Sequence, residues 1–247
     1  MTEKQNNYTN LNIHDKIKQL FYKNENFISN EIINTIDIFL KKGFKEQEEL
    51  LNILIKRQII DNKDITLLDG FIFKKLIETH TERIHKKISK IFPNGIIKLK
   101  SSLKIDYQPL QLLLIKNEFK EANQLTHKYL CILTNLDNIN KRNWLYFTDI
   151  SSLPSDDLFT IDLLWRIYSY GKFGFSIQRQ IWILNNYSWD KLWYKIGWIK
   201  EGKMRRYPEE FNWTLNAPKG HLPLINQLRG QQVISSLFKH IVWKDIT

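Results

Sequence analysis

Cysteine is nearly missing from this sequence, because Cys131 is the only one in 247 residues. A single thiol cannot form an internal disulfide framework, and it favours a reducing compartment. Metal sites built from clustered cysteines are excluded for the same reason. Long apolar runs are missing too: no stretch reaches the length of a bilayer span, and residues 1–10 lack the apolar core of a signal peptide. With no Arg/Ser-rich transit peptide either, we expect a chain that works where it is made or is already in mature form.

The common signatures of enzyme chemistry are also absent. The sequence has no Ser or Cys nucleophile motif, no glycine-rich phosphate loop and no His-Glu metal signature. Its six histidines are scattered, and we interpret them as surface or core residues; His127, His221 and His240 lie in the aromatic half and remain minor candidates for facing a metal. We interpret Asp156 and Asp157 as a helix cap rather than an acid/base pair. The sequence therefore predicts no catalytic residue.

Two residue types are missing from the first part of the chain. No proline precedes Pro93, and no tryptophan precedes Trp144. Charge divides at the same place: residues 1–92 carry 16 Lys and Arg against 13 Asp and Glu, net +3, whereas residues 93–247 carry 21 against 13, net +8. We therefore predict a domain over 1–92, a linker over 93–106 and a core domain over 107–247.

Apolar residues at helical spacing predict that the first domain is a small helical bundle. One stripe consists of Ile32, Ile33, Ile36, Phe39 and Leu40. Gly43 is expected to end that helix, a second helix is predicted over 45–60, and a third over 68–91. Pro-Asn-Gly at 93–95 is a turn signal that opens the linker.

The second domain is also predicted to be helical, so the fold class is all-α. Pro109 suits the first turn of a helical hairpin that breaks around Lys116–Asn117. A following helix should begin at Asp156 or Asp157 and stop at Gly171, with an apolar stripe made of Leu158, Ile161, Trp165 and Tyr168. We expect Ser176 to cap the next helix, and Pro223 to begin another that Gly230 interrupts.

Aromatic residues with interleaved cations distinguish the second domain. One interpretation is a tryptophan-rich core, and we assign Trp165 and Trp182 to it because both lie on helix stripes. A second interpretation is a site for a flat, anionic, apolar ligand, in which rings stack and guanidinium groups bind carboxylates. A single-stranded nucleic acid requires much the same groups. Composition alone leaves these alternatives open. The cations closest to the rings are Arg142, Arg166, Lys172, Arg179, Arg205, Arg206 and Arg229.

A family resemblance is carried by three stretches: LPSDDLFTIDLLWRIYSYGKFGFSIQRQIW (153–182), KLWYKIGW (191–198) and APKGHLPLINQLRG (217–230). In order and spacing they resemble the tetrapyrrole-binding "genomes uncoupled" family, the activators of magnesium chelatase. The resemblance runs from about Tyr107 to Trp243. Two positions depart from the family pattern: Asn123 replaces the usual Asp, and Phe119 replaces the usual Trp. The change at 123 removes any role for a carboxylate there.

The resemblance implies an all-helical, cupped domain that holds protoporphyrin IX or its magnesium chelate. It implies no chemistry by the protein itself, no catalytic cofactor, and no nucleic acid as partner. The implied partner is the large porphyrin-binding subunit of magnesium chelatase, in the plastid stroma or, for a cyanobacterial chain, the cytoplasm. Residues 1–92 resemble the helical appendage of algal and cyanobacterial members. The basic half leaves room for peripheral membrane association, although no dedicated amphipathic segment stands out.

The resemblance also implies which residues face the porphyrin. We expect the Phe173-Gly174-Phe175 loop to wall the cup, Ser176 to fix the following helix, and Gln178 to face inward or brace the loop. Arg229 has two interpretations, a partner for a porphyrin propionate or a C-terminal helix arginine that answers the helix dipole. The remaining residues carried over from the family motifs are Phe147, Tyr207 (where relatives often have Trp), Phe211, Trp213 and Asn226.

Two rival functions remain from the residues alone. A basic, aromatic single-stranded nucleic-acid binder should lose affinity steeply with salt. A helical adaptor would use the 107–133 hairpin as a docking surface and its aromatics as core. A porphyrin binder differs from the first because burial of the macrocycle, which salt weakens little, supplies most of its binding free energy.

Overall fold

The computed structural model describes residues 17, 19–21, 28–134, 144–225 and 231–244. Contacts divide the chain into two compact units, Met1–Ile96 and Ile97–Thr247. Helices dominate the described residues of both units, with one two-residue antiparallel hairpin of β1 (Ile199–Lys200) and β2 (Lys203–Met204). The all-α prediction is therefore confirmed. Crossing a bilayer would take a longer and more apolar helix than these described ranges contain.

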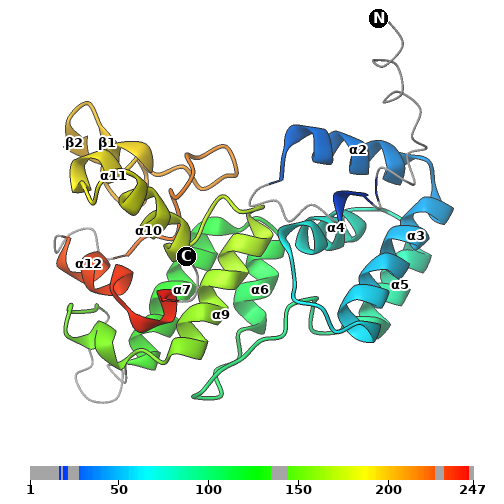
Figure 1. Cartoon of the computed structure of the whole chain (residues 1–247), viewed down its shortest axis with the longest axis horizontal. Helices are drawn as coiled ribbons and strands as arrows, with labels where there is room; N and C mark the ends of the chain where they lie inside the picture. Colours follow the sequence, from blue (N-terminus) through cyan, green and yellow to red (C-terminus); the bar gives the residue numbers. More distant parts are fainter. Residues whose placement is uncertain (1–16, 18, 22–27, 135–143, 226–230, 245–247) are drawn as a thin grey trace, which may run out of the picture. The chain divides into compact units, whose positions relative to one another are not determined.

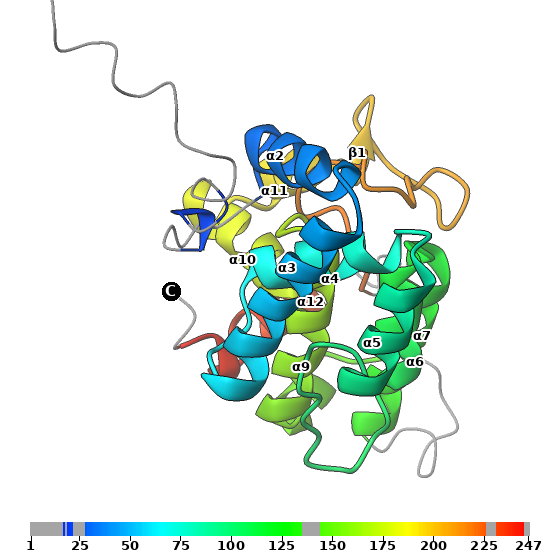
Figure 2. The ribbon, with the colours of Figure 1, turned by 90° about the vertical axis from the view of Figure 1, so that its right-hand side faces the viewer.

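The first unit is a bundle built around one central helix. α3 packs against α2, α4 and α5, and it runs beside α5 in both views (Figures 1 and 2). Its buried face and the α2 stripe at Ile32, Ile36, Phe39 and Leu40 form the core of this unit. Gly43 separates α2 from α3 at a φ of 137°, as predicted. The helical segments are α2 (Asn30–Lys41), α3 (Phe44–Ile55), the π-helical turn η1 (Lys56–Ile60), α4 (Leu67–Ile77) and α5 (Glu82–Ile91).

The prediction of one helix over 68–91 is wrong, because the chain forms α4 and α5 with a break between them. The hydroxyl of Thr79 donates to the carbonyl oxygen of Leu76 at 2.8 Å, and so takes an acceptor in the last turn of α4. Two residues later, the carbonyl of Thr81 accepts the N–H groups of Ile84 and His85 and opens α5. Threonine side chains compete for backbone groups in this way at helix ends.

The second unit begins with the predicted helical hairpin. α6 (Gln108–Ile115) and α7 (Phe119–Leu133) lie side by side (Figures 1 and 2). Pro109 is in the first turn of α6, and Asn117 makes the turn between the helices with a φ of 61°. The later elements are the 3-10 turn η2 (Asp149–Ser152), α9 (Ser155–Tyr168), α10 (Phe175–Leu184), α11 (Trp189–Lys195), α12 (Gln232–Phe238) and the 3-10 turn η4 (Ile241–Trp243).

Asp157 does not cap α9, which corrects the predicted cap at 156–157. The N-cap position is Pro154, and it makes no side-chain cap. The buried carboxylate of Asp157 instead accepts the Ser101 hydroxyl at 2.5 Å, the Ser102 N–H at 2.9 Å and the Tyr107 hydroxyl at 2.7 Å. Burial, followed by this hydrogen bond, raises the pKa of Tyr107. Residues 101–107, which include part of the predicted linker, are thereby fixed to α9.

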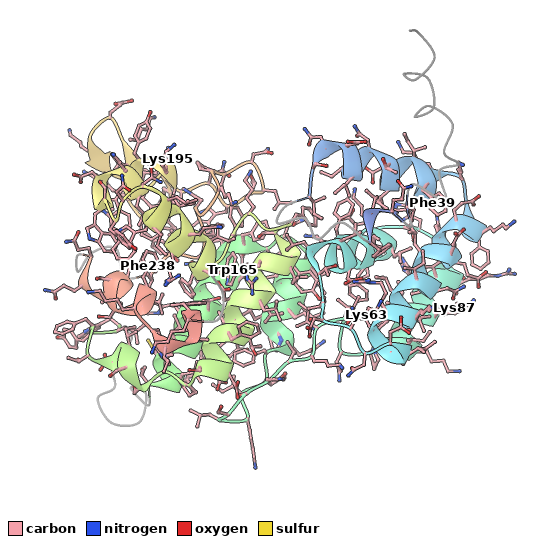
Figure 3. The ribbon with its side chains drawn as sticks, in the orientation of Figure 1. Phe39, Lys63, Lys87, Trp165, Lys195 and Phe238 are labelled. Carbon is pink, nitrogen blue, oxygen red and sulfur yellow. The ribbon has the colours of Figure 1, made fainter. Side chains whose placement is uncertain are left out.

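Trp165 lies at the centre of the second unit. Its side chain is fully buried, and its indole N–H donates to the hydroxyl of Thr126 on α7 at 2.9 Å. Its ring stacks on Phe119, with centroids 6.0 Å apart. The assignment of Trp165 to the core is confirmed, and Figure 3 marks it on α9. A phenylalanine at 119 thus still supplies a ring against this tryptophan.

Candidate functional site

The turn between α9 and α10 is held by a buried carboxylate. Gly174, with a φ of 137°, is the N-cap of α10, so the prediction that Ser176 caps this helix is wrong. Ser176 is instead a donor: its N–H and its hydroxyl bind the two oxygens of Asp162 at 2.9 and 2.7 Å. Arg166 pairs with the same carboxylate at 2.8 Å. A charged acceptor at a helix N-terminus is stabilising, so Asp162 stabilises the first turn of α10.

The two phenylalanines of this turn point into the core. Phe173 and Phe175 are both 0% exposed. Phe173 meets Phe119 edge to face, with centroids 5.4 Å apart, and Trp165 at 6.4 Å. Neither ring offers surface to a ligand in this conformation, so their contact with a porphyrin stays a prediction that rests on the family resemblance.

Gln178 braces the segment 220–224, which we call the anchor segment. Its amide nitrogen donates to the carbonyl oxygens of Gly220 at 2.9 Å and Pro223 at 2.8 Å. A helix beginning at Pro223 is not formed in the described residues 223–225, since these backbone groups bind side chains instead. Gln178 thus braces the anchor segment, whereas the sequence-based alternative had it brace the Phe173-Gly174-Phe175 loop.

The anchor segment is also attached to α7 and to the turn between α9 and α10. On α7, the side-chain oxygen of Asn123 accepts the N–H of Leu224 at 2.6 Å. On the α9–α10 turn, the N–H of Gly174 donates to the carbonyl of Leu222 at 3.0 Å. Only an acceptor oxygen is needed at position 123, so an amide serves there without a carboxylate. Sequence reasoning missed this role of Asn123, and its replacement of the family's usual Asp was the available signal.

Three predicted site residues meet in the segment 205–214, which we call the ring loop. The Trp213 ring lies 5.9 Å from Tyr207 and 6.2 Å from Phe211. The Trp213 indole N–H donates to the carbonyl of Pro208 at 3.0 Å, which closes the loop on itself. Tyr207 is 45% exposed and Phe211 6% exposed, so the loop has one buried ring and one that solvent reaches. The hydroxyl of Tyr207 accepts a 3.4 Å hydrogen bond from Gln124 on α7.

The other predicted site residues lie elsewhere. Phe147 is 48% exposed in the segment before η2, beside Tyr146, whose N–H donates to Asp149 at 2.6 Å. Among the described residues, no ring contact joins Phe147 to the ring loop. Asn226 and Arg229 lie outside the described residues, so their predicted roles are not addressed by the structure.

A row of ring contacts, which we call the tryptophan ladder, joins four tryptophans and ends at the ring loop: Trp182, Trp189, Trp193 and Trp198. Trp182 and Trp189 lie 4.8 Å apart, and further centroid distances of 5.4 and 5.2 Å continue the ladder to Trp193 and Trp198. Trp198 then meets Phe211 of the ring loop at 6.4 Å. At the other end Phe238 of α12 faces Trp182 at 5.5 Å (Figure 3). The assignment of Trp182 to the core is confirmed by its 9% exposure.

The histidines that we considered as metal-facing bind backbone or sulfur groups instead. His221 and His240 each use both ring nitrogens on backbone groups. His127 lies 4.0 Å from the sulfur of Cys131. Burial lowers the pKa of all three, so their neutral forms are favoured. Within the described ranges, no three His, Cys, Asp or Glu side chains gather as a metal site.

Comparison with known proteins identifies the family. The family described as GUN4-like matches residues 100–241, a range that includes the α9–α10 turn, the ring loop and the anchor segment. The chain belongs to the GUN4-like family. The predicted resemblance is therefore confirmed, and the GUN4-like region falls entirely in the second unit.

Relatives of this GUN4-like chain extend beyond that region. An uncharacterized protein ycf53 of Porphyra purpurea is 47% identical over 214 residues, which are 86% of this chain and 88% of the relative. A Ycf53-like protein of Synechocystis is 38% identical and covers 85% of this chain and 89% of its own length. The tetrapyrrole-binding protein, chloroplastic, of Arabidopsis thaliana is 33% identical and covers 51% of each chain. The first two matches, over 214 and 211 residues, are longer than the second unit (Ile97–Thr247) and so include part of the first unit.

Two solved structures share the GUN4-like fold. GUN4 from Chlamydomonas reinhardtii has a TM-score of 0.56 and 38% identity, and it covers 60% of this chain and 96% of its own. Ligand-free Arabidopsis thaliana GUN4 has a TM-score of 0.51 and 31% identity, with 58% and 98% covered.

The close approach at Gly174 predicts a large cost for a methyl group. A Cβ there would lie 2.9 Å from an Asp162 carboxylate oxygen and 3.0 Å from the Arg166 side chain. We expect Gly174→Ala to lower the free energy of unfolding by about 3 kcal/mol, from backbone strain and overpacking together. The matched control is Gly202→Ala, where φ is also positive but a Cβ meets nothing within 4 Å; we expect about 1 kcal/mol. Urea unfolding followed by tryptophan fluorescence measures both, since all eight tryptophans lie in the second unit. Equal losses would contradict the packing argument.

Gln178 gives a second prediction for the same assay. Gln178→Leu places an apolar side chain, one atom shorter, at this buried position and leaves the buried carbonyls of Gly220 and Pro223 without their donor, so we expect a loss of about 2 kcal/mol. Gln124→Leu removes a single hydrogen bond at the exposed surface, and its cost should stay within about 0.5 kcal/mol. If Gln178→Leu were as harmless as the control, the anchor segment would not depend on this side chain.

Proposed function

We propose that this chain is a non-catalytic regulator that binds protoporphyrin IX or its magnesium chelate and stimulates magnesium chelatase. The observation that carries the proposal is the GUN4-like match over residues 100–241. One relative in this set is named a tetrapyrrole-binding protein. The partner in this proposal is the large porphyrin-binding subunit of the chelatase, and the place is the plastid stroma, or the cytoplasm in a cyanobacterium.

The ring loop supplies the apolar part of the proposed site. Tyr207 is half-exposed and held edge-on to Trp213, with ring planes at 88°. Rings of this kind give a flat macrocycle a large apolar contact at a small entropic cost, since few bonds have to be immobilised. Phe147, exposed in a separate segment, is the other ring we propose to touch the ligand. We propose that Phe173, Phe175 and Gln178, which are buried, support this site from the core, where Gln178 binds the anchor segment.

Cations supply the polar part of the proposed site. A porphyrin of this class carries two propionates, and arginine binds carboxylates with two parallel, charge-assisted hydrogen bonds. Asn226 and Arg229 lie two and five residues after the anchor segment in the sequence. The anchor segment is held at Gly220, Leu222, Pro223 and Leu224, which supports a defined starting point for these two residues. We therefore propose Arg229 as the propionate partner.

A porphyrin titration tests the binding function. Adding the full chain to protoporphyrin IX or its magnesium form should shift the porphyrin absorption band and quench tryptophan fluorescence. We expect Arg229→Ala to weaken binding by about 1.5–3 kcal/mol through loss of a charged hydrogen bond, and Tyr207→Ala by about 1.5 kcal/mol through lost ring contact. Lys195→Ala, an exposed cation on α11, is the control that should bind normally.

The same titration at low and high salt separates the rivals. Porphyrin affinity should change little between about 50 and 200 mM salt, whereas a single-stranded oligonucleotide bound by phosphate contacts would lose affinity by orders of magnitude. An unmoved absorption band, with tight and salt-sensitive oligonucleotide binding, would reject the proposal in favour of the nucleic-acid function.

A chelatase assay tests the regulatory function. At limiting porphyrin, the wild-type chain should raise the rate of magnesium insertion by the purified chelatase. Tyr207→Ala and Arg229→Ala should raise it less, in proportion to their weakened porphyrin binding, and added porphyrin should restore part of the loss. Equal stimulation by wild type and by a variant that no longer binds porphyrin would instead identify a helical adaptor.

A further inference from the structure

His221 of the Gly-His-Leu-Pro block is buried where α11, the ring loop and the anchor segment meet. It is 1% exposed. Its Nδ1 lies 2.6 Å from the carbonyl oxygen of Ile196, the C-cap of α11, and its Nε2 accepts the N–H of Asn212 in the ring loop at 3.2 Å. A carbonyl can only accept and a backbone N–H can only donate, so Nδ1 carries the proton and Nε2 is bare. The ring therefore connects α11 to the ring loop only while it is neutral.

The rest of the residue holds this ring in place. The His221 carbonyl accepts the indole N–H of Trp198 at 2.8 Å, and its backbone N–H donates to Pro218 at 3.1 Å. The imidazole lies 5.3 Å from the ring of Phe211, tilted by 40°. His221 thus contacts both the end of the tryptophan ladder and the buried ring of the ring loop.

We propose that His221 is the positioning residue of the ring loop, and that its protonation releases this loop and weakens tetrapyrrole binding. The second half of this inference rests on the proposed function, because it needs a ligand on Tyr207 and Trp213. Protonation would place a new N–H at Nε2 directly against the N–H of Asn212. Two donors would then face each other in a partly buried position, and the hydrogen bond that holds the loop would be lost.

The surroundings of the ring favour its neutral form. Burial lowers the pKa of His221, the acceptor at Ile196 raises it, and the charge of Arg205 lowers it further. Arg205 lies in the ring loop and donates to the Gly197 carbonyl at 2.9 Å. Gln178, the α10 side chain that binds the anchor segment, is uncharged. The carboxylate of Glu210, in the ring loop, accepts the backbone N–H of Arg206 at 2.8 Å. Among the described residues, neither ring nitrogen is hydrogen-bonded to a carboxylate.

The direction of the pH effect follows from this lowered pKa. A released His221 titrates near its ordinary value of about 6.5, so the released loop binds the proton more readily than the closed loop. Neutral His221 stabilises the closed ring loop fully above about pH 6.5, and this stabilisation is lost as the pH falls below that value. One coupled proton changes the opening equilibrium by at most about tenfold per pH unit.

His240 provides a matched control in the same unit. Its Nε2 lies 3.0 Å from the carbonyl of Leu153, and its Nδ1 accepts the N–H of Val242 at 3.2 Å. Burial lowers its pKa as well. It therefore has the same chemistry as His221, but its partners lie outside the ring loop.

Hydrogen exchange of the full chain without ligand tests whether neutral His221 holds the ring loop closed. Amide exchange in residues 206–214, corrected for intrinsic rates, should rise up to about tenfold in wild type between pH 7.5 and 5.5. His221→Gln retains a donor and an acceptor but does not titrate, so its ring loop should show no such rise. His240→Gln should behave like wild type there. A flat wild-type profile, or an equal rise in His221→Gln, would overturn the proposal. If His221→Gln does not fold, the rise in wild-type exchange must level off at the pH where the His221 ring titrates in the closed protein, followed by NMR, and a mismatch would overturn the proposal.

Porphyrin affinity tests the coupling to function. The protoporphyrin IX affinity of wild type should fall more than that of His221→Gln between pH 7.5 and 5.5, by at most about tenfold, and the comparison cancels titration of the ligand itself. An unchanged ratio with a responsive ring loop would overturn the coupling. Absence of porphyrin binding at pH 7.5 would overturn the proposed function. Hydrogen exchange would still test whether His221 holds the ring loop.

Discussion

A buried stretch of non-helical backbone needs a partner for each of its polar groups, and this constraint organises the second unit. The anchor segment 220–224 passes through the interior without forming a helix or a strand, so side chains and the backbone of other loops supply its partners. Gln178 donates to two of its carbonyls, Asn123 accepts one N–H, and Trp198 donates to a third carbonyl. These donors and acceptors come from α10, α7 and the residues after α11. The segment consequently ties together elements that are far apart in the sequence.

The aromatic residues of this unit divide into buried rings that form the core and exposed rings that a ligand can reach. Trp165, Phe173 and Phe119 form a closed cluster in the core, and the tryptophan ladder of α10 and α11 continues to Trp198. Burial of this much apolar surface is the main favourable term in folding, and it makes the unit rigid. Tyr207 and Phe147 remain exposed. A rigid set of buried rings is what allows a few exposed ones to hold a fixed orientation toward a ligand.

Local patterns predicted helices well and their ends less well. The stripe at Ile32, Ile36 and Phe39 and the hairpin that breaks at Asn117 were found from spacing alone, because apolar periodicity survives into the structure. Asp157 and Ser176 had the right types and positions for helix caps, yet Asp157 binds residues 101–107 and Ser176 binds Asp162. A cap prediction assumes that the side chain binds the nearest backbone groups, but these two side chains bind partners from other segments.

The sequence by itself determined the family, the helical class and the place where composition changes, since motif order, spacing and residue type can be read along the chain. It also marked the blocks that matter, Phe-Gly-Phe-Ser and Gly-His-Leu-Pro. Only the tertiary structure decided which rings are buried: Phe173 and Phe175 turned inward, while Tyr207 stayed in reach of solvent. It alone assigned Gln178, Asn123 and His221 their backbone partners. The reason is that burial and hydrogen-bond pairing depend on which distant segments meet, and a one-dimensional pattern does not contain that information.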